Sequence, residues 1–299
     1  MPPIVPPIKC QGIKTKLVND IKATVQFPIQ GKWIEPFCGS CVVVLNVQPQ
    51  RALLADCNVH IISLYRDIQS GAVTGQMAKA YLSEQGELLR SVGEAHYYAI
   101  RDRFNREGSS LDFLFLNRSC FNGVMRFNKK GHFNVPFCRK PDRFAHALVT
   151  KITNQITNLA LVMRDKDWQF EVANFRDALS RAEPGDVVYA DPPYAGRHVD
   201  YYNSWSDGDE LDLTERLKNL PCQFILSTWI KNVYRENPLI EAHWRSSDYE
   251  ILSINHFYHV GSSEDLRHSM EEGIITNARI RERHQTAMGP IEQLNLLPT

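Results

Sequence analysis

The sequence predicts an α/β fold built on an open, mostly parallel sheet. Three short apolar runs end in an acidic residue, at Glu35, Asp56 and Asp191. Short apolar runs between turn residues are typical of buried parallel strands, and helical segments between such runs make the crossovers. Ligands bind at the carboxyl ends of the strands of an open α/β sheet, so these acids are candidate site residues.

The composition excludes several classes of protein. The chain has 299 residues, 43% of them hydrophobic, and a formal net charge of zero. This length suits one large domain or two smaller ones. No apolar run approaches the roughly 18 residues of a membrane helix, and we expect no secretory signal. The seven cysteines are odd in number and scattered, which favours reduced thiols in a cytoplasmic protein.

The charges are unevenly distributed although they sum to zero. Between Arg90 and Lys151 there are 12 Lys and Arg residues against 5 Asp and Glu. A basic segment in an otherwise acidic chain indicates a face for a polyanion. A solvated surface without such a partner explains the same count equally well.

The first predicted elements surround a loop of small residues. A glycine loop leads into a helix with apolar positions at Leu17, Val18, Ile21 and Val25. A strand then ends near residues 35–36, and the small residues at 38–40 let a ligand approach the start of the next helix. Cys38 and Cys41 also form a C-x-x-C pair of the redox-active kind. A zinc site would need a second ligand pair, and the sequence offers none with suitable spacing.

A second strand ends at Asp56 and precedes a predicted helix over 59–68. Asp56 follows Gly39 by 17 residues, close to the roughly 20 at which an acid of a Rossmann unit accepts a ribose hydroxyl. A lone aspartate at a strand end is also a common helix N-cap. After the loop at 37–40, we interpret Asp56 as a nucleoside-binding residue.

The alternation of strands and helices is lost between residue 71 and about residue 150. Residues 76–105 have a helical apolar pattern, and a polar, glycine-bearing stretch follows over 117–137. Asn128 to Gly131 suit a hairpin turn. Basic and amide side chains interleaved with aromatic ones fit phosphates and base edges. An ordinary hairpin with solvated charges has the same composition.

The alternation then resumes. We expect helices over 143–163, from Asn174, and over 209–219, strands over 170–172, 186–194 and 223–227, and a final strand pair at 249–257 and 273–277. The polar loop between 195 and 209 is long enough for a lid. Residues after about 282 are expected to form a flexible tail.

The most distinctive motif is Asp191-Pro192-Pro193-Tyr194. The two prolines stop the strand, because proline fixes φ and lacks a backbone donor. The Asp191 carboxylate and the carbonyls beside the prolines can then accept hydrogen bonds from an amino group, and the Tyr194 ring can face a flat heterocycle. For the tetrapeptide alone, a surface turn after a strand is the simple alternative.

Taken in order, these segments resemble the DNA adenine N6-methyltransferases of the Dam/DpnII type, the class alpha or D12-class family. The resemblance covers roughly residues 7–278. The loop at 37–41 is similar to the family's F-x-G-x-G, the run at 56–58 to its D-x-N, and Asn174-Phe175 to its usual D-F. The D-P-P-Y motif together with the N-V-P-F of the insert, at 134–137, is specific. Departures are Cys10-Gln-Gly-Ile13 for W-x-G-G, Cys41 for the last loop glycine, and Asn174 for aspartate.

The resemblance implies a Rossmann-like S-adenosylmethionine-dependent methyltransferase fold, in the α/β class. Its sheet is mixed and mostly parallel with a C-terminal antiparallel hairpin. The catalytic domain would be discontinuous, over 1–72 and 151–282. A mainly helical target-recognition insertion with a β-hairpin would occupy 73–150, and a tail 283–299. Methyl would pass directly from S-adenosyl-L-methionine to N6 of a flipped-out adenine in double-stranded DNA, leaving S-adenosyl-L-homocysteine. No metal is required.

The resemblance also implies roles for individual residues. The catalytic residues are Asp191, Pro192, Pro193 and Tyr194. The cofactor-binding residues are Cys10, Lys14, Glu35, Pro36, Phe37, Gly39, Ser40, Asp56, Cys57, Asn174, Phe175 and Asp191. The DNA-binding residues are Lys9, Arg118, Phe121, Asn122, Val124, Arg126, Asn128, Asn134, Pro136 and Arg139.

The resemblance implies that different recognition residues contact different parts of the DNA. Arg126 would read a guanine on the 5′ side of the adenine, and Phe121 would wedge into the stack. Val124 and Pro136 would meet apolar base edges, and four residues would hold phosphates: Arg118, Asn128, Asn134 and Arg139. The expected site contains G-A, with G-A-T-C the first choice.

Other readings of the chain remain open at this point. The same D-P-P-Y chemistry serves transfer to cytosine N4 or to RNA, and a non-catalytic DNA-binding relative is a third reading. We expect a cytoplasmic monomer of bacterial, archaeal or phage origin, with no membrane partner. A restriction endonuclease for the same site is a candidate partner.

Overall fold

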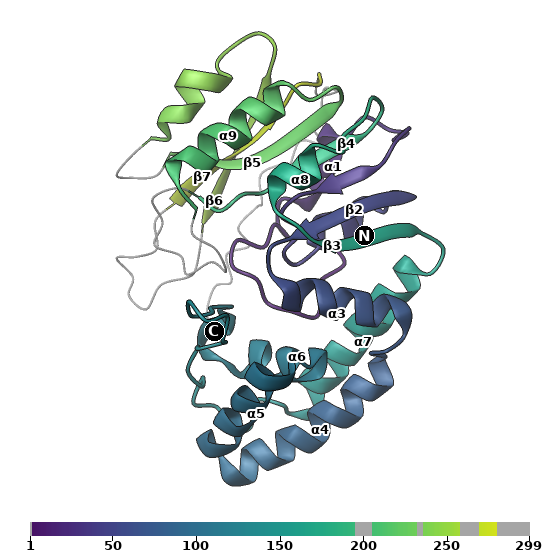
Figure 1. Cartoon of the computed structure of the whole chain (residues 1–299), viewed down its shortest axis with the longest axis vertical. Helices are drawn as coiled ribbons and strands as arrows, with labels where there is room; N and C mark the ends of the chain where they lie inside the picture. Colours follow the sequence, from purple (N-terminus) through teal and green to yellow (C-terminus); the bar gives the residue numbers. More distant parts are fainter. Residues whose placement is uncertain (1, 195–204, 232–235, 258–268, 280–299) are drawn as a thin grey trace, which may run out of the picture.

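One seven-stranded sheet forms the centre of the described part of the computed structural model, which covers residues 2–194, 205–231, 236–257 and 269–279 (Figure 1). The strands are β1 (Trp33–Glu35), β2 (Arg51–Asp56), β3 (Asp167–Val172), β4 (Val187–Ala190), β5 (Gln223–Lys231), β6 (Glu250–Phe257) and β7 (Ser269–Thr276). Strands β1 to β5 are parallel, and β7 is antiparallel to both β5 and β6. The predicted mixed sheet with an antiparallel C-terminal pair is confirmed.

The strand order, β3-β2-β1-β4-β5-β7-β6, reverses direction between β1 and β4. From β1 the chain moves outward to β2 and β3 and then returns to the other side of β1. Trp33 of β1 accordingly pairs with Ala52 on one side and with Val187 on the other. Ligands of doubly wound sheets bind at such a switch point, outside the carboxyl ends of the strands.

Helices cover both faces of the sheet, because alternate residues of a strand point to opposite faces. Trp33 belongs to the core cluster that includes residues of the first three helices, and its neighbour Ile34 to the cluster formed with the last two. These helices are α1 (Val18–Thr24), α2 (Val42–Val47), α3 (Val59–Ser70), α8 (Phe175–Leu179) and α9 (Asp207–Lys218). A π-helix over Ile240–Trp244 adds two buried residues to the second cluster.

A group of helices lies at the end of the molecule away from α8 and α9 (Figure 1). They are α4 (Gly75–Val92), α5 (Glu94–Glu107), α6 (Ser110–Ser119) and α7 (His146–Met163), with a short 3-10 turn, η1 (Phe121–Gly123). The single helical run expected over 76–105 is wrong in one respect. Gly93 has a φ of 74° and divides it into α4 and α5.

The hairpin expected at residues 125–135 is present as a turn with isolated bridges. Phe127 and Phe133 form an antiparallel bridge. The amide of Asn128 donates to the carbonyl of His132 at 2.9 Å, and the amide of Gly131 to the carbonyl of Asn128 at 2.8 Å. The predicted turn is therefore confirmed, although the segments on either side of it are not strands.

The other expected elements are found with shifted ends. The helix expected from residue 143 begins at His146, and the strand expected over 186–194 ends at Ala190, before the two prolines. Of the polar loop expected over 195–209, residues 195–204 lie outside the described residues, and α9 already begins at Asp207. The tail expected after 282 also lies outside them. Within the described ranges, no helix has the length and apolar character needed to cross a membrane.

Candidate active site

The carboxyl ends of the three central strands β2, β1 and β4 bring together the acids singled out from the sequence. Glu35 ends β1, Asp56 ends β2, and Asp191 directly follows β4. The loop after β1 is a tight turn in which the amide of Cys41 donates to the carbonyl of Cys38 at 2.7 Å. Gly39 has a φ of 47° and Cys41 a φ of 57°. This turn delivers the chain into α2 beside the switch point.

Asp56 organises this turn. Its Oδ2 accepts from the amide of Gly39 at 2.9 Å, and its Oδ1 from the amide of Asn58 at 2.8 Å. Burial raises the pKa of Asp56, and these two amides oppose the rise. Asn58, not Asp56, is the N-cap of α3, since its side chain accepts from the amide of His60. The N-cap alternative for Asp56 is therefore wrong.

Asp191 forms an ion pair with Lys14. The ammonium of Lys14 lies 2.7 Å from Oδ1 and 3.0 Å from Oδ2 of Asp191, and also donates to the carbonyl of Gly12 at 2.9 Å. The side chain of Lys14 is 4% exposed and that of Asp191 21%. Burial raises the pKa of Asp191, and the charge of Lys14 opposes the rise. Lys14 thus favours the ionised carboxylate.

The Tyr194 ring lies next to the ion pair of Lys14 and Asp191. Its centroid is 5.2 Å from the ammonium of Lys14, within reach of a cation–π interaction. Pro192 is buried, and Pro193 is half-buried. A carboxylate, a buried cation and an aromatic ring therefore meet just beyond β4. This set of groups can accept a hydrogen bond from an amino group and contact the face of a ring.

Glu35 points into the core. It is 2% exposed, and it accepts a hydrogen bond from Nε1 of Trp33 at 2.8 Å. Burial raises the pKa of Glu35 to about 8, although the hydrogen bonds from Trp33 and from the Val44 amide act to lower it. Its contacts in this structure support the loop that follows β1, and Pro36 is buried beside it.

Aromatic rings from three segments meet near the start of α8. Phe37 stacks on Phe175 with centroids 5.6 Å apart, and Trp205 contacts both rings at 5.5 and 5.4 Å. Asn174 caps α8, because its Oδ1 accepts from the amides of Arg176 and Asp177. Sequence reasoning missed Trp205. It lies within the polar loop expected over 195–209, but no motif in the sequence marks it.

Three cysteines lie around the turn, and burial makes them poor nucleophiles. The thiol of Cys10 is 3.6 Å from the place a Cβ would take at Gly39. Burial raises the pKa of Cys10 to about 12, and it also raises the pKa of Cys38 and of Cys41. A redox-active thiol needs the opposite shift. Among the described residues no cluster of His, Cys, Asp and Glu is suited to hold a metal ion.

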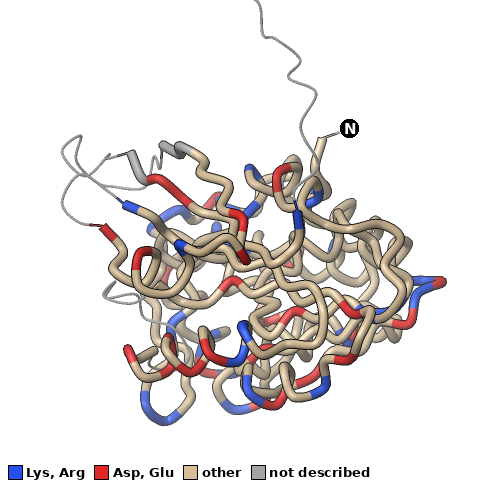
Figure 2. Tube along the Cα trace, turned by 90° about the horizontal axis from the view of Figure 1, so that it is seen from above, with Lys and Arg blue, Asp and Glu red and all other residues tan. Residues whose placement is uncertain are grey.

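The expected recognition residues lie on and around the hairpin. Phe121 is 54% exposed, and Asn122, Pro136 and Arg139 are also exposed. The Nε of Arg126 donates to Oδ1 of Asn134 at 2.9 Å, so the two side chains hold each other. Figure 2 shows Lys and Arg interspersed with Asp and Glu along much of the trace.

Two expected phosphate contacts have roles within the protein in this structure. Arg118 is 7% exposed and donates to the carbonyl of Pro7 at 3.2 Å. Its burial lowers its pKa to about 10. Oδ1 of Asn128 accepts from the amides of Lys130 and His132 and so closes the hairpin turn. The expectation for Arg118 in particular needs revision, because a guanidinium this buried does not reach a phosphate.

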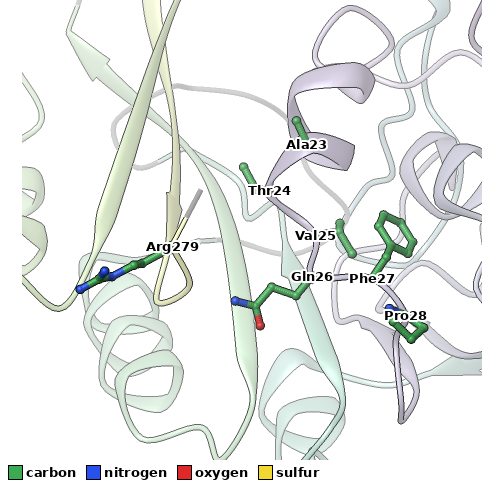
Figure 3. Close-up of a pocket in the computed structure, with 7 residues that line it drawn as sticks. All are labelled: Ala23, Thr24, Val25, Gln26, Phe27, Pro28 and Arg279. Atoms are coloured by element: carbon green, nitrogen blue, oxygen red, sulfur yellow. The ribbon is translucent and has the colours of Figure 1, made fainter. Parts of the chain in front are cut away.

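A separate pocket lies at the other end of β5. It is lined by Ala23, Thr24, Val25, Gln26, Phe27, Pro28 and Arg279 (Figure 3). Gln223, the first residue of β5, donates to the carbonyl of Thr24 and accepts from the amide of Gln26. This pocket is therefore at the amino end of the parallel strands, away from Asp191.

The doubly wound sheet, with its acid-lined switch point and the prolines after β4, defines an α/β protein with a candidate ligand site at the carboxyl ends of its central strands. Residues 11–260 match the family model for D12 class N6 adenine-specific DNA methyltransferases. The chain therefore belongs to this family.

Individual relatives agree with the family match. The retron Ec67 DNA adenine methylase of Escherichia coli is 30% identical over 220 residues, 71% of this chain and 71% of that protein. The DNA adenine methylase of Escherichia coli strain K12 is 34% identical over 197 residues, 63% of this chain and 64% of that one. The type II methyltransferase M.FokI of Planomicrobium okeanokoites is 28% identical over 283 residues, 91% of this chain but only 42% of that protein.

Proposed function

We propose that this protein transfers a methyl group from S-adenosyl-L-methionine to N6 of an adenine flipped out of a short duplex DNA site that contains G-A. The observation that carries the proposal is the position of Asp191-Pro192-Pro193-Tyr194 immediately beyond β4, at the switch point of the sheet. Asp191 and the carbonyl of Pro192 would accept from the N6 amino group, and Tyr194 would stack on the base. Holding the nitrogen at near-attack distance in line with the methyl is mainly an orientation effect.

The residues at the carboxyl ends of β1 and β2 fit the cofactor. Gly39 has no Cβ, its φ is 47°, and a Cβ built there would meet only ordinary contacts, so the backbone of the turn is open to a ligand. Asp56 would accept a ribose hydroxyl, while Phe37 and Phe175 offer rings to the adenine of the cofactor. Ser40 and Cys57 flank these groups. When bound, the cofactor supplies an electrophilic methyl on a sulfonium.

Lys14 has a defined task in this scheme. Its charge keeps Asp191 ionised although burial favours the protonated form. An ionised carboxylate is the stronger acceptor for the amino group of the incoming adenine. That amino group would take the place of Lys14 on one carboxylate oxygen, while Lys14 keeps the other.

The insertion over 73–150 would recognise the DNA. Arg126, held by Asn134, would present its guanidinium to a guanine, which is a bidentate contact worth about 1–3 kcal/mol of discrimination. Phe121 would fill the gap left by the flipped base, and Val124 and Pro136 would contact apolar base edges. Asn128, Asn134 and Arg139 would contact the phosphates. We also propose that the protein is a cytoplasmic monomer and that a restriction endonuclease acting on the same DNA site is its partner.

Methyl incorporation into paired duplexes tests this function. One duplex would carry G-A-T-C and the other G-T-A-C, which has an adenine but no G-A step on either strand, and the product would be identified after digestion to nucleosides. We expect N6-methyladenine from the first duplex alone, and none with the Asp191→Ala variant. N4-methylcytosine, labelling of RNA in place of DNA, or undiminished labelling by the variant would refute the proposal. Calorimetry with sinefungin, with and without Phe175→Ala, tests the cofactor site independently of turnover.

A further inference from the structure

The N-terminal segment before Lys14 is fixed to the helical insertion at Lys9. The amide of Lys9 donates to Oδ1 of Asn117 at 2.7 Å, and Nδ2 of Asn117 donates back to the carbonyl of Lys9 at 2.8 Å. Asn117 is fully buried in α6. Both backbone groups of Lys9 are therefore held by one side chain that is 108 residues away in sequence.

The side chain of Lys9 lies against η1, the turn that presents Phe121. A Cβ at Gly123 would lie 2.4 Å from Cδ of Lys9, closer than real atoms approach, and 3.0 Å from Cβ of Lys9, which is a tight contact. Gly123 thus leaves the space that the stem of Lys9 occupies. With a φ of 68°, Gly123 also has a conformation that favours glycine.

The surroundings of Lys9 are cationic. Burial lowers the pKa of Lys9, and the charges of Arg143 and Arg118 lower it further. In the ranges that the structure describes, no carboxylate forms a salt bridge with any of these three side chains. A half-exposed ammonium among other cations is suited to an anion from outside the protein, and duplex DNA supplies phosphates.

Lys9 is also close in sequence to Lys14, the ion-pair partner of Asp191. Lys14 is five positions after Lys9, a span of at most about 18 Å even when fully extended. Lys14 forms the ion pair with Asp191. The segment 9–14 therefore links η1, where the exposed Phe121 lies, to the site of the reaction.

We propose that Asn117 and Gly123 are positioning residues that hold Lys9 beside η1, where its ammonium contacts a DNA phosphate next to the flipped adenine. The proposal rests on the function proposed above. It adds two residues that do not themselves touch DNA, and it makes the placement of Lys9 depend on the insertion. Asn117 fixes the backbone of Lys9, and Gly123 leaves room for its side chain.

Two matched pairs of variants test it. Gly123→Ala is compared with Gly131→Ala, because Gly131 has a similar φ of 75° and no atom within 4 Å of its Cβ position. Asn117→Leu is compared with Asn46→Leu, because Asn46 holds the backbone of Ile4 with the same two hydrogen bonds, at 2.8 and 3.0 Å. Both glycine variants add a Cβ at a positive φ, and both asparagine variants remove two hydrogen bonds to the backbone of the N-terminal segment. Only one variant of each pair affects Lys9.

The readout is the salt dependence of DNA binding, measured by fluorescence anisotropy on a G-A-T-C duplex, beside thermal unfolding of each variant. Lys9→Ala should reduce the log–log salt slope by about one and weaken binding roughly tenfold at low salt. Gly123→Ala and Asn117→Leu should do the same, and their matched controls should keep the wild-type slope. Gly123→Ala should have no additional effect in a Lys9→Ala background.

Each outcome is decisive. Equal slopes for Gly123→Ala and Gly131→Ala, or a wild-type slope for Lys9→Ala, would overturn the positioning role while leaving the proposed function intact. If Gly123→Ala does not fold, the Asn117 and Asn46 pair decides alone. A wild-type protein that neither binds nor methylates the duplex would instead reject the proposed function.

Discussion

The ammonium of Lys14 lies 2.7 Å from Oδ1 of Asp191, and 177 residues separate the two in sequence. This pair joins the N-terminal segment to the loop after β4. Because Lys14 is almost completely buried, its charge acts on Asp191 with little screening by solvent. The ion pair therefore controls the protonation of the carboxylate that the proposed reaction needs.

Replacing Lys14 should move the acidic limb of the pH–rate profile. Asp191 must be ionised to accept the amino group, so activity falls as the pH drops through its pKa. Burial raises the pKa of Asp191 and the charge of Lys14 lowers it, so this pKa should rise when Lys14 is replaced. In Lys14→Gln we expect the acidic limb of kcat/KM to move to higher pH. The exposed Lys16, as Lys16→Gln, is the control and should leave the limb unchanged. An unchanged limb in Lys14→Gln would contradict this account.

Asp191→Asn should separate stability from catalysis. The variant leaves the buried Lys14 without its carboxylate, which should cost about 2 kcal/mol of unfolding free energy, since Asp191 is itself partly exposed. The double variant Lys14→Met with Asp191→Asn removes the unpaired charge and should recover most of that loss. Methyl transfer should stay about a hundredfold or more below wild type in both. Urea unfolding and single-turnover assays measure the two effects. Activity recovered by the double variant would argue against a role for the carboxylate.

The sequence predicts the sheet and its acids because that information is local. Each strand is a short apolar run, and an acid at its carboxyl end reaches the binding edge whatever the rest of the chain does. Glu35, Asp56 and Asp191 are accordingly found at the ends of β1 and β2 and directly after β4. The two prolines likewise set the end of β4 from sequence alone.

The missed features depend on contacts between distant segments. Helix α6 is buried from Asp112 to Ser119, so it lacks the apolar stripe by which a half-buried helix is detected. Arg118 was expected at the DNA, but it lies inside and donates to Pro7, 111 residues earlier. The same holds for Asn117 and Lys9. Local patterns contain no information on such pairs.

Cys38 and Cys41, in the turn after β1, should react slowly with thiol reagents in the folded protein. Burial raises the pKa of Cys38 and of Cys41, which leaves few thiolates near neutral pH. Cys38→Ser with Cys41→Ser should therefore keep methylation within a few-fold of wild type, and native protein should show no fast thiol-reagent reaction at these positions. Activity that is lost on mild oxidation, restored by reductant and insensitive to oxidation in the double variant would instead favour a redox role.

The stacking of His60 on Phe127 should make stability depend on pH. The rings lie 5.1 Å apart at 12°, which joins α3 to the hairpin. Burial lowers the pKa of His60 from 6.5 to about 4. Between these values the unfolded chain binds more protons than the folded one, so stability is present above about pH 6.5 and is lost as the pH falls toward 4.

Replacement of His60 by phenylalanine isolates this effect. His60→Phe retains a ring against Phe127 but cannot titrate, so its unfolding free energy should fall less than that of wild type between pH 7 and pH 4. Between pH 7 and pH 4, wild type should lose at most about 3 kcal/mol more unfolding free energy than His60→Phe, and less than this because solvent reaches part of the ring. Urea unfolding at several pH values measures it, with the exposed His132 of the same hairpin, as His132→Ala, for comparison. If wild type and His60→Phe lost stability in parallel, protonation of His60 would not be the cause of the pH dependence.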